Sequence, residues 1–143
     1  MTPKKLEIKF EDQKYPNTTA TMQVVDGILI LTAKGQHDIQ LAKDSFATTL
    51  AIFFKEGVHK TIVDISGLRG EVSSIQKFDY MEYVGKTLKA YFKAGGRPPK
   101  IAYVLEEQYL ESNKGFTDVL RKEYSLIINS FTTHEEAIKW LNS

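Results

Sequence analysis

Apolar and polar positions alternate along the first part of the chain in the manner of β-strands. Residues 6–10 alternate apolar and charged side chains, and two further β-rich runs, residues 20–25 and 28–33, flank the dipeptide Asp26-Gly27. Asp-Gly between two such runs is a strong signal for a tight hairpin turn. Residues 28–31 are apolar on both faces, which is typical of a strand inside a sheet. The pattern predicts one strand and then an antiparallel hairpin.

Helical and strand-like patterns alternate through the rest of the chain. Apolar residues at helical spacing, bounded by capping and glycine signals, mark the helices, and short apolar runs mark the strands. Alternation of this kind predicts parallel strand pairs joined by crossover helices. We expect helices over residues 38–57, 73–94, 113–124 and 133–141, and strands over residues 61–65, 101–105 and 125–128. The chain is thus predicted to be a single α/β domain over residues 1–143. Its sheet is mixed and mainly parallel, with an N-terminal antiparallel hairpin and about four flanking helices.

Composition narrows the function without identifying it. Lysine and arginine number 19 against 18 acidic residues, and the two signs are evenly mixed along the chain, so the strong basic field that nucleic-acid binding needs is missing. No cysteine is present, which excludes disulfides and thiolate metal sites and fits a cytoplasmic location. No apolar run approaches the ~20 residues of a membrane-spanning helix.

One segment combines a buried strand with a serine pair. Asp64 ends the apolar part of the strand, Ser66-Gly67 is predicted to begin a short loop, and Ser73-Ser74 opens the longest helix. Ser73 and Gln76 have the spacing of a capping box, in which each side chain binds the other residue's backbone N–H.

This segment resembles the hallmark of the STAS-like fold, and specifically the SpoIIAA-like family of small bacterial proteins. The hallmark is a strand, Asp-apolar-Ser-Gly, five further residues and Ser-Ser at a helix start. Residues 64–67 and 73–74 match it, and Phe131 to Leu141 resembles the family's last helix. The resemblance implies a STAS-like domain, similar to the antagonists of anti-sigma factors, and a comparison with lipid-binding domains of the CRAL-TRIO type.

The resemblance also implies a phosphorylation switch at the serine pair. A phosphate on Ser73 would add about −1.5 to −2 charge units at a helix N-terminus, where free N–H groups favour an anion. In the phosphorylatable family members an acidic residue precedes the pair, whereas Val72 stands there in this chain. Ser73 is therefore open to two interpretations, a helix cap and a regulated serine, with Asp64, Ser66, Gly67 and Ser74 as its partner surface.

No catalytic or metal-binding set can be assembled from the sequence. The histidines at positions 37, 59 and 134 lack metal-ligand spacing, and no phosphate-binding G-x-x-x-x-G-K-[ST] motif occurs. Asp64 follows a central strand, where α/β proteins place functional groups, but it also suits a local turn. We expect no enzyme, no cofactor and no metal.

Two helices carry more apolar residues than one buried face requires. On the 73–94 helix one stripe, predicted to face the core, contains Phe78, Met81, Leu88 and Phe92, and a second contains Tyr80, Val84 and Tyr91. Such helices cover a wider core, a homodimer surface or a pocket. Residues predicted for an apolar pocket are Phe46, Leu50, Phe53, Phe78, Met81 and Phe92.

The sequence predicts a non-enzymatic regulatory module that recognises another protein. The alternative is a carrier or sensor of a lipid or other apolar small molecule, which a closed cavity would favour. A basic run near the end of the long helix, residues 86–100, also suits a membrane surface. Nucleic acid is excluded as a partner.

Overall fold

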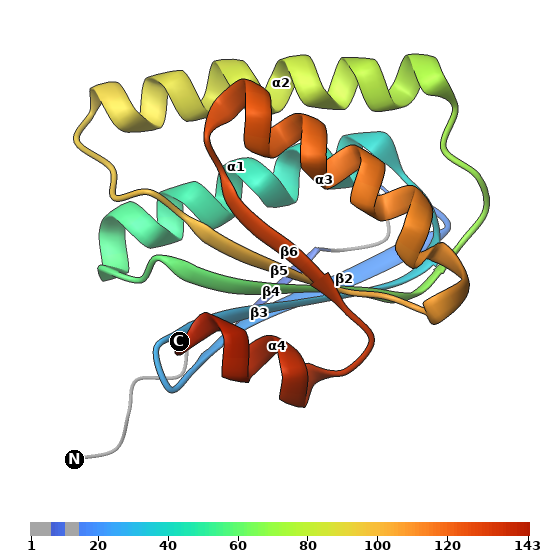
Figure 1. Ribbon diagram of the computed structural model, residues 1–143, viewed down its shortest axis with the longest axis horizontal. Helices are drawn as coiled ribbons and strands as arrows, with labels where there is room; N and C mark the ends of the chain where they lie inside the picture. The colour runs from blue at the N-terminus through green and yellow to red at the C-terminus, as the bar shows by residue number, and fades with distance from the viewer. Residues whose placement is uncertain (1–6, 11–14) are drawn as a thin grey trace.

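A six-stranded mixed sheet forms the centre of the protein, with strands in the order β1-β2-β3-β4-β5-β6. The computed structural model describes residues 7–10 and 15–143 (Figure 1). The strands β1 to β3 pair antiparallel, and β3 to β6 pair parallel. Their bounds are Glu7–Phe10 (β1), Thr18–Val25 (β2), Ile28–Gln36 (β3), Lys60–Arg69 (β4), Lys100–Val104 (β5) and Ile127–Phe131 (β6). This arrangement confirms the predicted mixed α/β fold.

The helices lie in two layers on opposite faces of the sheet. Their bounds are Ile39–Glu56 (α1), Ser74–Lys93 (α2), Leu110–Tyr124 (α3) and His134–Leu141 (α4). Each of α1, α2 and α3 connects two adjacent parallel strands, and connections of one hand place all three on the same face. Figure 1 shows these three helices above the sheet and α4 below it. Among residues 7–10 and 15–143, no helix is long and apolar enough to cross a membrane.

The predicted hairpin between β2 and β3 is confirmed. Asp26 and Gly27 both have positive φ, 51° and 78°. Two such residues make the turn whose twist matches that of the flanking strands. The strand β3 lies between β2 and β4, as its two apolar faces predicted.

β2 begins at Thr18 and β3 ends at Gln36, both beyond the predicted runs, and three further boundaries are wrong. The presumed loop after Ile65 is strand, because β4 continues to Arg69 and pairs with the end of β3 across a bulge. The last strand begins at Ile127 instead of Ser125, since Ser125 adopts a left-handed conformation (φ 56°) that ends α3. A 3₁₀ turn over Glu107–Tyr109 leads into α3, which begins at Leu110 rather than Asn113.

The predicted core face of α2 is only half right. Leu88 is buried and Met81 packs against the core, but Phe78 and Phe92 are 62% and 38% exposed. The second stripe also faces the core, with Val84 and Tyr91 buried. Tyr80 fixes this rotation because its ring packs edge-on against Phe46 of α1 and stacks on Phe116 of α3.

Candidate functional site

Asp64 and Ser66 lie on the α4 face of the sheet and form one hydrogen-bonded cluster with His134. His134, the first residue of α4, places its Nε2 2.7 Å from Asp64 Oδ2. The other carboxylate oxygen of Asp64 accepts from the Ser66 backbone N–H at 3.0 Å and from Ser66 Oγ at 2.6 Å. Burial by itself would raise the pKa of Asp64, but hydrogen bonds from His134 and Ser66 lower it below its usual value.

This cluster fastens α4 to the sheet and does not activate a nucleophile. In a Ser-His-Asp arrangement the serine must donate to the histidine that deprotonates it. Here Ser66 donates to Asp64 instead of to the histidine. The Nε2 of His134 faces the same carboxylate and does not face the serine hydroxyl. The geometry holds a β-strand and a helix together, 70 residues apart in sequence.

Gly67 lies at a close approach beside the β-bulge. A Cβ at this position would lie 3.0 Å from Lys34 Cγ and 3.1 Å from the Ala33 carbonyl oxygen. A side chain there would need its neighbours on β3 to shift by a few tenths of an ångström. The Ser-Gly pair of the motif therefore lies in a tightly packed part of β4 rather than in a loop.

Ser73 is the N-cap of α2, and the predicted capping box is present. Its Oγ accepts from the Gln76 backbone N–H at 3.1 Å, and the Gln76 side chain accepts from the Ser73 backbone N–H at 3.1 Å. Ser73 and Ser74 are both exposed, on the same edge of the sheet as the pocket described next.

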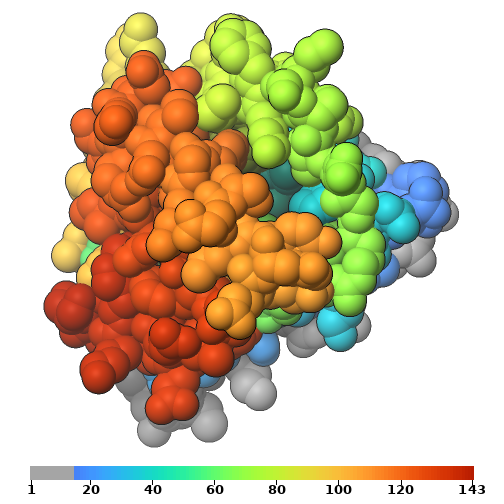
Figure 2. All heavy atoms as spheres, turned by 45° about the vertical axis from the view of Figure 1, so that its right-hand side comes forward, coloured from blue at the N-terminus to red at the C-terminus, as the bar shows by residue number. Residues whose placement is uncertain are grey.

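A pocket of about 530 Å³ opens on the three-helix face, at the carboxyl ends of β3, β4 and β5. Open α/β sheets place their ligands at this edge. Figure 2 turns the edge toward the viewer, and the surface is hollowed between the beginnings of α2 and α3. None of the six residues predicted for an apolar pocket lines this cavity.

The floor of the pocket is the sheet itself. Val63, Ile65 and Leu68 of β4 line it and are only half-buried. By contrast Ile62, on the other face of the same strand, is fully buried. Apolar side chains of a central strand are normally covered by helices, so their exposure here marks a cavity rather than a surface irregularity.

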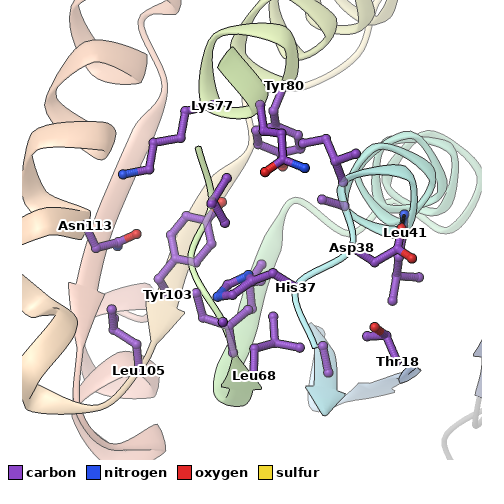
Figure 3. A pocket seen from close by; sticks show the side chains of 18 of the residues that line it. Thr18, His37, Asp38, Leu41, Leu68, Lys77, Tyr80, Tyr103, Leu105 and Asn113 are labelled. Atoms are coloured by element: carbon purple, nitrogen blue, oxygen red, sulfur yellow. Dashed lines mark hydrogen bonds between the residues drawn. The ribbon is translucent and has the colours of Figure 1, made fainter. Parts of the chain in front are cut away.

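Polar groups surround the mouth of the pocket and come from separate elements. Figure 3 shows His37 and Asp38 from the β3–α1 connection, Lys77 from α2 and Asn113 from α3. Asp38 caps α1 by accepting from the Leu41 N–H at 3.0 Å. Partial burial and the positive charge of Lys77 lower the pKa of His37, which keeps its imidazole neutral at neutral pH.

Two tyrosines reach into the pocket from opposite sides. Tyr103 rises from β5, and Tyr80 faces it from α2 (Figure 3). Burial raises the pKa of Tyr103 to about 12 and holds that of Tyr80 well above its usual value. Both phenols therefore stay protonated and serve as neutral hydrogen-bonding groups.

Sequence reasoning missed this pocket, although one signal pointed to it. The connections that follow β3, β4 and β5 all supply lining residues, among them His37, Glu71 and Leu105. Parallel strands carry these connections to one edge of the sheet, so their residues could have been grouped as a site. Val72, noted for replacing an acid, is half-buried in the same lining. In the described part of the chain no three His, Asp or Glu residues gather as metal ligands.

Comparison with solved structures identifies the fold. An anti-sigma factor antagonist from Mycobacterium paratuberculosis is similar over 90% of this chain and 97% of its own, with a TM-score of 0.55 and 13% identity. A protein from Thermotoga maritima, described as a candidate anti-sigma factor antagonist, is similar over 85% of this chain and 93% of its own, with a TM-score of 0.55 and 19% identity. No protein-family profile and no curated protein sequence matches the chain. The protein thus has the STAS-like fold of anti-sigma factor antagonists, as the sequence resemblance predicted.

Proposed function

We propose that this protein is a non-enzymatic binding module whose pocket holds an apolar small molecule with some polar groups. The observation that carries the proposal is the floor of the pocket, where Val63, Ile65 and Leu68 are only partly buried. A cavity of about 530 Å³ lies within the range of small-molecule sites, and an apolar lining with a few polar groups is typical of them. This is the alternative that the sequence left open, although the pocket opens at the edge of the sheet and is not the closed cavity expected to mark it.

The proposal is tested by filling the pocket. Ala42 lines it from α1, and Ala42→Phe would place a ring in the ligand's space. Ala51→Phe, on the exposed side of the same helix, is the matched control. We expect native mass spectrometry of the protein purified from its own host to show a bound small molecule in the wild type and in Ala51→Phe, and none in Ala42→Phe. A bare wild-type chain, or a mass retained by Ala42→Phe, would contradict the proposal.

Recognition of another protein is a second candidate function, favoured by an exposed apolar patch. Ile75 and Phe78, on the first two turns of α2, are 81% and 62% exposed beside the Ser73-Ser74 pair. Apolar side chains exposed together are typical of interaction surfaces, and the structural neighbours described as anti-sigma factor antagonists support the same reading. Phe78→Ser should then abolish capture of a partner in a pull-down while leaving thermal unfolding unchanged. Equal capture by both chains would count against this surface.

A further inference from the structure

We propose that the ligand of the pocket is a compact planar aromatic molecule with uncharged hydrogen-bonding groups, rather than an acyl chain. This inference rests on the proposed function of the pocket as a small-molecule site. It depends on which side chains form the two walls of the cavity and on where its polar groups stand.

The wall facing the sheet contains three aromatic rings from three different elements, beside residues of α1 such as Ile39 and Ala42. The rings are Tyr80 of α2, Tyr109 of the 3₁₀ turn and Phe116 of α3. Tyr80 and Phe116 already stack, with centroids 6.0 Å apart and planes 28° apart. Tyr109 is 43% exposed at the mouth of the pocket. A planar ring is the group that gains most from such a wall, because aromatic pairs attract beyond the area that they bury.

The opposite wall is mainly aliphatic. It consists of β-strand side chains, among them Ala33, Val63 and Ile65, with Tyr103 standing beside them on β5. Side chains of a sheet stand roughly perpendicular to it and form a level surface. A planar molecule lying between the aliphatic floor and the aromatic wall contacts both with its two faces.

The polar groups encircle the pocket instead of gathering at one end. His37, Lys77, Tyr103 and Asn113 belong to the β3–α1 connection, α2, β5 and α3 respectively. A fatty acid needs one polar head site and a long apolar channel, whereas a ring with several substituents needs partners on several sides. Asn113 is held in place by donating to Ser130 Oγ at 2.6 Å, so its amide is a fixed partner.

The charges of the lining do not select an ion. Lys77 brings one positive charge, while Asp38 and Glu71 bring negative ones. Asp38 is committed to capping α1. His37 is neutral at neutral pH, and so are the phenols of Tyr80 and Tyr103, which hydrogen-bond to each other. A ligand with hydroxyl, amide or ring-nitrogen groups satisfies this set without a buried unpaired charge.

The test compares two probes with one carbon skeleton, 2-naphthol and its saturated analogue decahydro-2-naphthol, with 1-octanol as an acyl-chain probe. Binding is followed by methyl NMR of the wild-type protein, in which an aromatic ligand shifts the Val63 and Ile65 methyl signals through its ring current. We expect 2-naphthol to bind about threefold to tenfold more tightly than the saturated analogue. Tyr109→Leu should reduce the ratio of the two affinities. Phe92 is a comparably exposed ring outside the pocket, so Phe92→Leu should leave that ratio unchanged.

The outcomes separate this inference from the function on which it rests. If the saturated analogue or 1-octanol shifts the same methyl signals with equal or higher affinity, the pocket binds small molecules but the aromatic preference is wrong. If none of the three probes shifts these signals, both the inference and the proposed pocket function fail. The comparison of the two probes uses the wild-type protein alone. The inference is therefore tested even if the Tyr109→Leu chain does not fold.

Discussion

Helices cover the two faces of β4 to different extents. On the face below, the short helix α4 seals a small cluster that includes Ile62, Ala137 and Leu141, each no more than 1% exposed. On the face above, three longer helices leave Val63 and Ile65 of the same strand partly uncovered. The larger helical layer is therefore the one with the gap. The three-helix face also holds the larger core cluster, which includes Phe53, Leu88 and Leu120, so the gap is confined to the edge of that face at the carboxyl ends of the strands.

The largest expected effect compares two isoleucines on one strand. Ile62→Ala removes a side chain from the sealed face and should lower the free energy of unfolding by about 3 to 4 kcal/mol, because it leaves a cavity. Ile65→Ala makes the same chemical change on the pocket floor, where the side chain is already partly uncovered, and should cost only about 1 kcal/mol. Urea unfolding of the three chains measures both. Equal losses would mean that the pocket face is packed as tightly as the α4 face.

The second prediction concerns the fastening of α4 by Asp64. Asp64→Asn removes the charge that His134 and Ser66 stabilise and should cost about 1 to 2 kcal/mol at neutral pH. Because the folded-state pKa of Asp64 lies below its usual 3.8, its contribution is present above that pH and is lost as the pH falls through the lowered value. Wild-type stability should therefore fall more steeply than that of the variant as the pH drops below about 4.

Asp79→Asn is the control for this pH dependence. Asp79 pairs with Lys43 at 2.6 Å, but its side chain is 54% exposed. Exposed pairs contribute at most about 1 kcal/mol. Asp79→Asn could reduce the loss of stability below about pH 4 as much as Asp64→Asn does. In that case the pH dependence does not come from the Asp64 contact with α4.

The elements were predictable from the sequence because their signals are local. Periodicity, the Asp26-Gly27 turn and the Ser73–Gln76 capping box each depend on residues close in the chain, and all three are observed. The rotation of α2 was not predictable in this way. Both of its stripes are apolar, and only the contacts of Tyr80 with Phe46 and Phe116 decide which of their residues face inward.

The prediction of the pocket residues failed for a related reason. Its lining residues come from strands and helices that lie far apart in sequence, and a cavity depends on what the helices leave uncovered. The six predicted pocket residues were chosen for apolar character alone. That property places Phe46, Leu50 and Phe53 in the packed core and Phe78 at the surface equally well. The local turn considered for Asp64 is observed in the bond from the Ser66 backbone N–H, but His134 follows 70 residues later and only the fold brings it to Asp64.

The smallest expected effect is at Ser73, on the rim of the binding face. Ser73→Ala removes the cap of α2 and should lower the free energy of unfolding by about 1 kcal/mol. Ser73→Asp keeps an N-cap acceptor and adds a negative charge that the helix dipole favours, so it should remain within a few tenths of a kcal/mol of the wild type.

The same two variants separate a cap from a switch. Val72 lines the pocket next to Ser73, so the residue that precedes the serine serves the apolar lining, whereas phosphorylatable family members have an acid there. If the cap is the whole role, Ser73→Asp should bind probes and partners as the wild type does, and only Ser73→Ala should differ in stability. A Ser73→Asp chain that loses partner capture while staying as stable as the wild type would instead show that charge at this rim regulates the binding face, and would restore the phosphorylation switch that the resemblance implied.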